Sequence, residues 1–320
     1  MSEATPATPT TSTLPTPSWR VSVNQLWQNP MTMKELRARM RGRRAFVILT
    51  LYLLLMCGFV AVLYLGFAIG SNNRSSESRI AGKTIFTTIL GIQAFLAVFI
   101  SPAFTAASIT GEKERQTYDL LRTTLLSARA LVTGKLFSAL SYVLLLILAA
   151  IPLQSVAFLL GGVSFIELFV SQLLMVVSAI TFGMMGIYIS SLMRTTIAAT
   201  VTTYALVLLS VVGIPVLALF ILPFMSLLMA PGAPVTLPPW TSVVLVYVAL
   251  ALGSLNLPAT LIASDVFLTQ YGAIFYYTDT IDSYTIVILS PWWIYLLAYS
   301  VLALLFFWAS IRRVKQISNV

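Results

Sequence analysis

The sequence predicts an all-α polytopic membrane protein. It would have six transmembrane helices, an N-terminal amphipathic interfacial helix, and an apolar outer-leaflet hairpin between the fifth and sixth helices. Of its 320 residues, 58% are hydrophobic and 9% are charged, whereas about a quarter of the residues in soluble domains are charged. Several apolar runs reach the ~20 residues that a helix needs to cross the hydrocarbon core. Lys and Arg gather beside these runs, as is typical of cytoplasmic loops.

Two segments precede the first apolar run. Residues 1–18 are rich in Thr, Pro and Ser and cannot bury a core, so we expect a disordered cytoplasmic tail. In residues 19–44, Asn29 can cap a helix that begins at Pro30. The segment carries apolar side chains as well as basic ones, which favours a helix lying in the cytoplasmic interface; a basic anchor that only sets the topology is the alternative. The basic residues of this interfacial helix are Lys34, Arg37, Arg39, Arg41, Arg43 and Arg44.

Residues 45–320 are predicted to form a single transmembrane domain with both termini in the cytoplasm, because the chain is basic beside its first and last spans. The outer region, residues 223–285, contains three Asp and no Lys or Arg. A seventh apolar run at 241–263 would then dip into the outer leaflet or pack between spans. In this topology 16 of the 19 basic residues face the cytoplasm. The predicted spans are 45–70, 84–109, 136–160, 166–190, 195–222 and 286–311.

The residue types do not favour catalysis by this chain. There is no histidine, and the single cysteine, Cys57, lies in the first apolar run. Gly134-Lys135 resembles the end of a phosphate-binding loop, but Arg129 occupies a position where that motif needs Gly, and Leu136 replaces its Ser or Thr. We therefore expect no bound cofactor and no enzyme activity in this chain. The net charge of +9 follows from the cytoplasmic loops, so no nucleic-acid partner is expected.

The predicted spans also lack buried ionisable residues, apart from Glu167 at one helix end. Carriers driven by ions or protons usually place acidic groups inside the membrane. Their predicted absence disfavours a proton-driven carrier, and energy for transport would have to come from another protein.

The cytoplasmic loop at 110–135 carries eight charges in 26 residues and is the place where a partner would bind. A helix over residues 111–125 is predicted, capped by Thr110 and with acidic residues in its first turn, where they favour the helix dipole. Tyr118, Leu121 and Leu125 would form an apolar face for a partner groove. A solvated loop is the alternative. The candidate coupling residues are Glu112, Lys113, Glu114, Arg115, Tyr118, Asp119, Leu121 and Leu125.

Three motifs together resemble the permease subunit of a type-2 ABC exporter. They are NPMTMKELR at 29–37, ITGEKERQT at 109–117 followed by DLL and closed by Gly134-Lys135, and ISSL at 189–192 with Arg194. The middle motif is the most specific, and the resemblance covers the chain from about residue 29 to its end.

The resemblance implies a six-helix permease in the plasma membrane that pairs with a second permease subunit, as a homodimer or a heterodimer. Two cytoplasmic ABC-type ATPase subunits would bind ATP-Mg, and the 110–125 helix would couple them to the translocation path. Three alternatives are kept: an ion-gradient-driven secondary transporter, a membrane enzyme, and a non-transport membrane scaffold.

Overall fold

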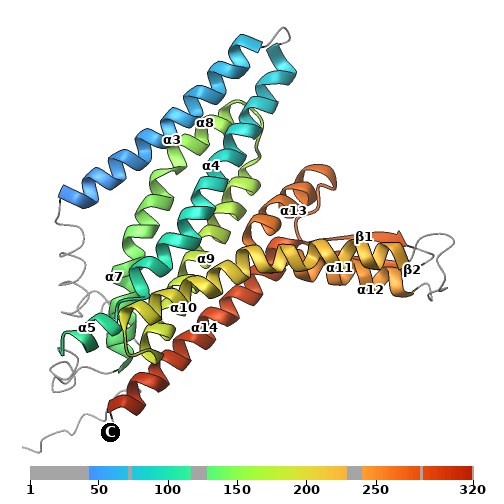
Figure 1. Cartoon of the computed structure of the whole chain (residues 1–320). Helices are drawn as coiled ribbons and strands as arrows, with labels where there is room; N and C mark the ends of the chain where they lie inside the picture. Colours follow the sequence, from blue (N-terminus) through green and yellow to red (C-terminus); the bar gives the residue numbers. More distant parts are fainter. Residues whose placement is uncertain (1–42, 71–73, 117–127, 229–239, 282–283, 319–320) are drawn as a thin grey trace, which may run out of the picture.

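The computed structural model describes residues 43–70, 74–116, 128–228, 240–281 and 284–318 (Figure 1). Among these, six helical stretches are long and apolar enough to cross a membrane, or seven if one bent helix pair counts as a span. The prediction of an all-α polytopic membrane protein is therefore confirmed. The tail 1–18 and most of the interfacial segment lie outside the described residues, while Arg43 and Arg44 lie in the first turn of the first described helix.

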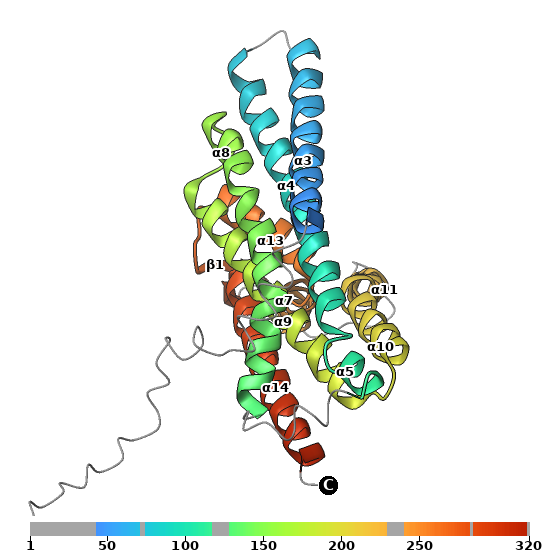
Figure 2. The same cartoon turned by 90° about the vertical axis from the view of Figure 1, so that its left-hand side faces the viewer.

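The described elements follow one another in this order: α3 (Arg43–Gly70), α4 (Arg74–Thr105), α5 (Thr110–Glu114), α7 (Ala128–Ala149), α8 (Ile151–Leu159), α9 (Phe165–Leu192), α10 (Thr196–Leu208), the π-helical turn η1 (Leu209–Gly213), α11 (Ile214–Leu228), α12 (Trp240–Ser254), α13 (Leu257–Gln270), β1 (Tyr276–Ile281), β2 (Tyr284–Leu289) and α14 (Pro291–Ser318). Figures 1 and 2 place α5 and the C-terminal end of α14 at one end of the molecule. The C-terminal end of α3 and the N-terminal end of α4 lie at the opposite end.

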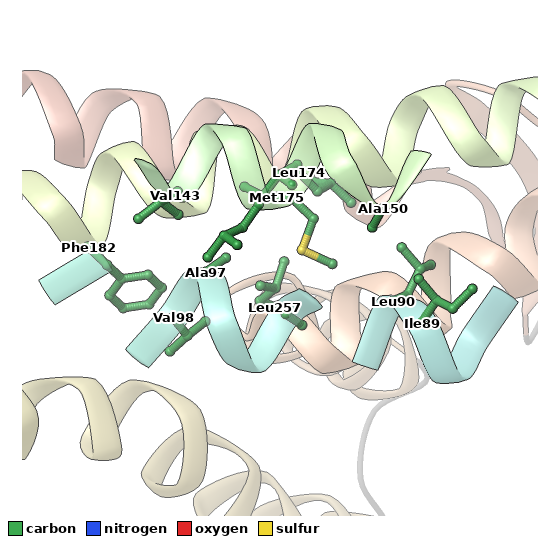
Figure 3. Close-up of a cluster of buried hydrophobic side chains, with 14 of the residues drawn as sticks. Ile89, Leu90, Ala97, Val98, Val143, Ala150, Leu174, Met175, Phe182 and Leu257 are labelled. Atoms are coloured by element: carbon green, nitrogen blue, oxygen red, sulfur yellow. The ribbon is translucent and has the colours of Figure 1, made fainter. Parts of the chain in front are cut away.

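The core is built around α9, which packs against α4, α7, α10 and α14. Figure 3 shows side chains of α4 and α9 facing each other, among them Ala97, Leu174 and Met175. Contact with α4 is close because α9 carries glycines there: a Cβ at Gly186 would lie 2.2 Å from Thr105 Oγ1. By contrast, only 11% of the most apolar stretch of α3 is buried, and 6% of that of α10–α11. These two spans therefore present their apolar side chains outward.

The fifth span contains the π-helical turn η1 just before Pro215, which has no N–H for the carbonyls one turn before it. Asn256 replaces that donor. Its Nδ2 donates to Ser210 O (3.1 Å) and Val211 O (2.9 Å), while its Oδ1 accepts from the backbone N–H of Ala259 and so caps α13. One side chain thus connects the π-helical turn of the fifth span to the start of α13.

The outer region differs from its prediction in two ways. The apolar run at 241–263 forms α12 and α13, which meet at an angle of 120°, because Asn256 and Pro258 start a new helix there. The predicted sixth span at 286–311 also begins too early. Residues 284–289 form β2, antiparallel to β1, since buried Ile286 and Ile288 alternate with exposed neighbours.

The β-hairpin packs on α13 through Phe267 and its aromatic neighbours. The Tyr271 and Tyr277 rings stack with their centroids 4.3 Å apart. Burial, followed by the hydrogen bond with Tyr271, raises the pKa of Tyr277 to about 12. The Tyr277 hydroxyl therefore stays protonated at physiological pH and can donate a hydrogen bond.

Candidate functional site

The short helix α5 is capped by another helix rather than by its own residues. We predicted Thr110 as the cap, but Thr110 is the first residue of α5, and Ile109 before it makes no side-chain cap. The hydroxyl of Ser190, on α9, accepts hydrogen bonds from the backbone N–H of Ile109 and of Thr110, both at 3.0 Å. Because these N–H groups have no partner within a helix of five residues, α9 determines where α5 begins.

Lys113 binds the C-terminal end of α9. Its ammonium donates to Ser191 O (2.8 Å) and Met193 O (3.1 Å). The last carbonyls of a helix lack partners inside it and carry partial negative charge. A lysine from α5 therefore satisfies both the hydrogen bonding and the electrostatics of this helix end.

Glu114 binds the N-terminal end of α10, a helix that begins four residues after the last residue of α9. Its carboxylate accepts from the backbone N–H and from the hydroxyl of Thr196, each at 2.6 Å. A negative charge is favourable at this end of a helix. Neighbouring residues of α5 thus hold the two sides of the α9–α10 turn with charges of opposite sign.

Glu112 connects α5 to the third span. Lys135, on α7, is 3% exposed and donates to Glu112 Oε1 (2.6 Å) and to Ser108 O (2.7 Å). Lys135 was predicted to close the cytoplasmic loop, but it lies inside α7, since that helix begins at Ala128. We call the following residues the α5 cluster: Glu112, Lys113, Glu114, Lys135, Ser190 and Thr196.

The predicted helix over 111–125 is interrupted. It ends at Glu114, and Gln116 has a φ of 57°, a left-handed conformation that a right-handed helix cannot accommodate. Arg115 follows α5 and is exposed. The remaining predicted residues lie outside the described residues: Tyr118, Asp119, Leu121 and Leu125 on the loop, and Lys34, Arg37, Arg39 and Arg41 before α3.

Sequence reasoning missed the partners of α5. Ser190 and its neighbour Ser191 were noted only as part of a motif, and Thr196 was not noted at all. Each lies about 80 residues from its partner on α5, so spacing along the chain gives no sign of the contact. The only signal was the ISSL motif itself. It places small polar residues at the end of a span.

The end of the molecule that holds α5 is rich in exposed basic side chains. Arg312 lies over the Trp308 ring, 3.2 Å from its centroid, which holds the guanidinium by a cation–π contact. Such a surface attracts acidic protein segments and anionic lipid headgroups. The exposed basic residues are Arg115, Arg129, Arg194, Arg312, Arg313 and Lys315.

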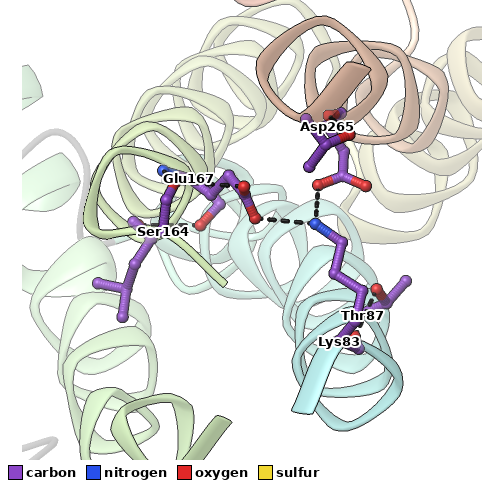
Figure 4. A network of polar contacts seen from close by, with 8 residues as sticks. Lys83, Thr87, Ser164, Glu167 and Asp265 are labelled. Atoms are coloured by element: carbon purple, nitrogen blue, oxygen red, sulfur yellow. Dashed lines mark hydrogen bonds and ion pairs between the residues drawn. The ribbon is translucent and has the colours of Figure 1, made fainter. Parts of the chain in front are cut away.

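A second charged network joins α4, α9 and α13 (Figure 4). Lys83, on α4, donates to Glu167 Oε2 of α9 (2.8 Å) and to Asp265 of α13. The helices extend beyond the predicted spans 84–109 and 136–160, so that Lys83 and Lys135, one residue outside those bounds, lie within candidate spans. The charges are accommodated by pairing, as buried charges must be. Among the described residues, no group of His, Cys, Asp or Glu is suited to hold a metal ion.

Comparison with known proteins gives a family for this chain. The model of a family described as ABC-2 family transporter protein matches residues 30–309. None of the curated proteins matches the sequence. The matched stretch includes the α5 cluster and the Lys83 network, so both belong to the part of the chain that the family model describes.

Proposed function

Because this chain belongs to the ABC-2 family of transporter proteins, we propose that it is the membrane-spanning permease subunit of an ATP-driven exporter. ATP-Mg is bound and hydrolysed by separate cytoplasmic ATPase subunits. The chain crosses the plasma membrane several times with both termini in the cytoplasm. The exposed basic residues at the α5 end support that orientation, since cytoplasmic loops are enriched in Lys and Arg.

The observation that carries this proposal is the attachment of α5 to three spans. Within five residues, α5 binds α7 through Glu112, α9 through Lys113 and α10 through Glu114. A partner that moves the loop around α5 moves the ends of all three spans with it. Coupling needs an element of this kind, whose position both the ATPase and the translocation path influence.

A second permease subunit, identical or different, completes the path. The outward apolar side chains of α3 and of α10–α11 support this part of the proposal, because so little of either span is buried within the chain. Exposed aliphatic surface on a membrane span faces either lipid or another helix. Residues 117–127 and the interfacial segment before α3 supply further contacts to the ATPase.

The test combines co-purification with transport. The chain should co-purify with an ABC-type ATPase and move cargo in proteoliposomes only when ATP is present. Arg115 suits charge reversal better than Glu112 or Glu114, because it is exposed and those two have internal partners. Arg115→Glu should weaken ATPase binding and transport, while Arg79→Glu, an exposed arginine on α4, should leave both unchanged.

Three results would contradict the proposal in different ways. Transport by the ATPase-free chain under an ion gradient would identify a secondary transporter. ATPase binding without any ATP-dependent transport would identify a scaffold. Intact binding and transport in Arg115→Glu would remove this end of α5 from the coupling surface.

A further inference from the structure

We propose that the chain binds an amphipathic organic cation in a cavity between α4, α9 and α13. The cavity has a volume of about 430 Å³, within the ~300–1,000 Å³ of small-molecule sites. It lies within one subunit, so its ligand would not need a second copy of the chain. The inference rests on the proposed function only in treating that ligand as cargo.

The body of the ligand is apolar because the cavity wall is apolar. Its side chains come mainly from one face of α4 and from α9 and α13, and several are aromatic. Aromatic rings also attract organic cations through their π faces. The apolar lining includes Phe86, Leu90, Phe95, Phe99, Leu174 and Leu261.

The positive charge of the ligand follows from the charges at the cavity. The charged residues in the lining are Glu167 and Asp265, both acidic. Lys83 bridges the two carboxylates (Figure 4) but is not part of the lining. One ammonium against two carboxylates leaves one net negative charge. Charge in a medium of low polarity is costly until it is paired, and a cationic ligand would pair it.

Ser264 gives independent evidence for a ligand. It is 3% exposed and lines the same cavity, next to Asp265. Within the described part of the chain, its hydroxyl has no hydrogen-bond partner. A buried hydroxyl is usually paired, because leaving it unpaired destabilises the protein. A polar group of a bound ligand would supply the missing bond.

Two ions of the same shape and opposite charge can test the proposal. The full-length chain is placed in phosphatidylcholine nanodiscs without the ATPase, and binding of tetraphenylphosphonium and of tetraphenylborate is measured. We expect saturable binding of the cation, with one ion per chain, and no binding of the anion beyond that of empty nanodiscs. A hydrophobic site without charge preference would bind both.

Substitutions locate the site. Asp265→Asn keeps the size of the side chain and removes one counter-charge, so it should weaken cation binding by about tenfold or more. Gly91→Phe leaves both acids in place and fills the cavity, since Gly91 is in the lining and a Cβ there meets nothing within 4 Å. It should abolish binding. Asp279→Asn, at an exposed carboxylate on β1, is the matched control and should bind as the wild type does.

The proposal is wrong if both ions bind alike, or if Asp265→Asn and Gly91→Phe bind the cation as well as Asp279→Asn. Thermal unfolding of each variant shows whether it is folded, and Gly91→Phe tests the site even if Asp265→Asn is unstable. Intact binding combined with a failure of ATP-dependent transport would count against the proposed function and leave this site in place.

Discussion

Replacing Ser190 by alanine should release the start of α5 from α9. The Ser190 hydroxyl is fully buried and accepts two hydrogen bonds, from the backbone N–H of Ile109 and of Thr110 at 3.0 Å each. Leaving one buried N–H unpaired costs about 1–3 kcal/mol, so losing both partners costs about 2–6 kcal/mol. The contacts of Glu112, Lys113 and Glu114 still hold the rest of α5, so the loss falls on its first residues. We expect a folded protein in which the start of α5 separates from α9 more often.

Hydrogen exchange measures this release directly. A change of 2 kcal/mol is roughly thirtyfold in an equilibrium constant, so the amides of Ile109 and Thr110 should exchange at least about thirtyfold faster in Ser190→Ala. Ser191→Ala is the matched control, because Ser191 is also buried and its hydroxyl donates only to Tyr188 O of its own helix. Equal exchange rates in the two variants would refute the capping of α5 by α9.

Three other contacts can be tested by unfolding the protein in detergent. Gly186→Ala puts a carbon 2.2 Å from Thr105 Oγ1 and should lower the free energy of unfolding by about 1–3 kcal/mol. In the control Gly91→Ala, the new carbon has no atom within 4 Å, so this variant should be neutral or slightly stabilising. Equal effects of the two substitutions would contradict the close packing of α9 on α4. Asn256→Ala leaves two carbonyls unpaired and should cost about 1–3 kcal/mol for each, with faster exchange at the start of α13; unchanged exchange would refute the link. Lys135→Met removes the ammonium that pairs with Glu112 and donates to Ser108 O, and it should cost about 3–5 kcal/mol, whereas a loss below 1 kcal/mol would mean that the pair is not buried.

The helical framework was predictable because lipid imposes strict rules. A backbone in hydrocarbon must satisfy its own hydrogen bonds, so long apolar runs become helices. The same rule misled the prediction at residues 286–289. Hydrophobicity alone extended the sixth span over a segment that is a strand. Buried Ile286 and Ile288 alternate with exposed Val287 and Leu289, but all four side chains are apolar, so the sequence shows no alternation.

The charged contacts could not be predicted from the sequence. Lys83 and Asp265 are 182 positions apart, and Lys135 and Glu112 are 23 apart, and neither spacing marks a pair. The charges of α5 were identified as a group, but they were interpreted as facing a partner. Internal contacts bind Glu112, Lys113 and Glu114, and the role of these residues towards a partner stays a prediction. The roles of Tyr118, Asp119, Leu121 and Leu125 stay predictions.

The central place of α9 affects how the protein is made. The spans before it, α3, α4 and the α7–α8 pair, are synthesised first. Until α9 is made, the Ser101 hydroxyl of α4 lacks its acceptor, Ala179 O of α9. On the other side, Tyr295 of α14 meets the Ser178 hydroxyl only when the chain is nearly complete. Biosynthesis is therefore most vulnerable before Phe165. A chain whose synthesis stops there has three spans but no α9 for them to pack against. Its polar groups, such as the Ser101 hydroxyl, would be unpaired and open to recognition by membrane quality control.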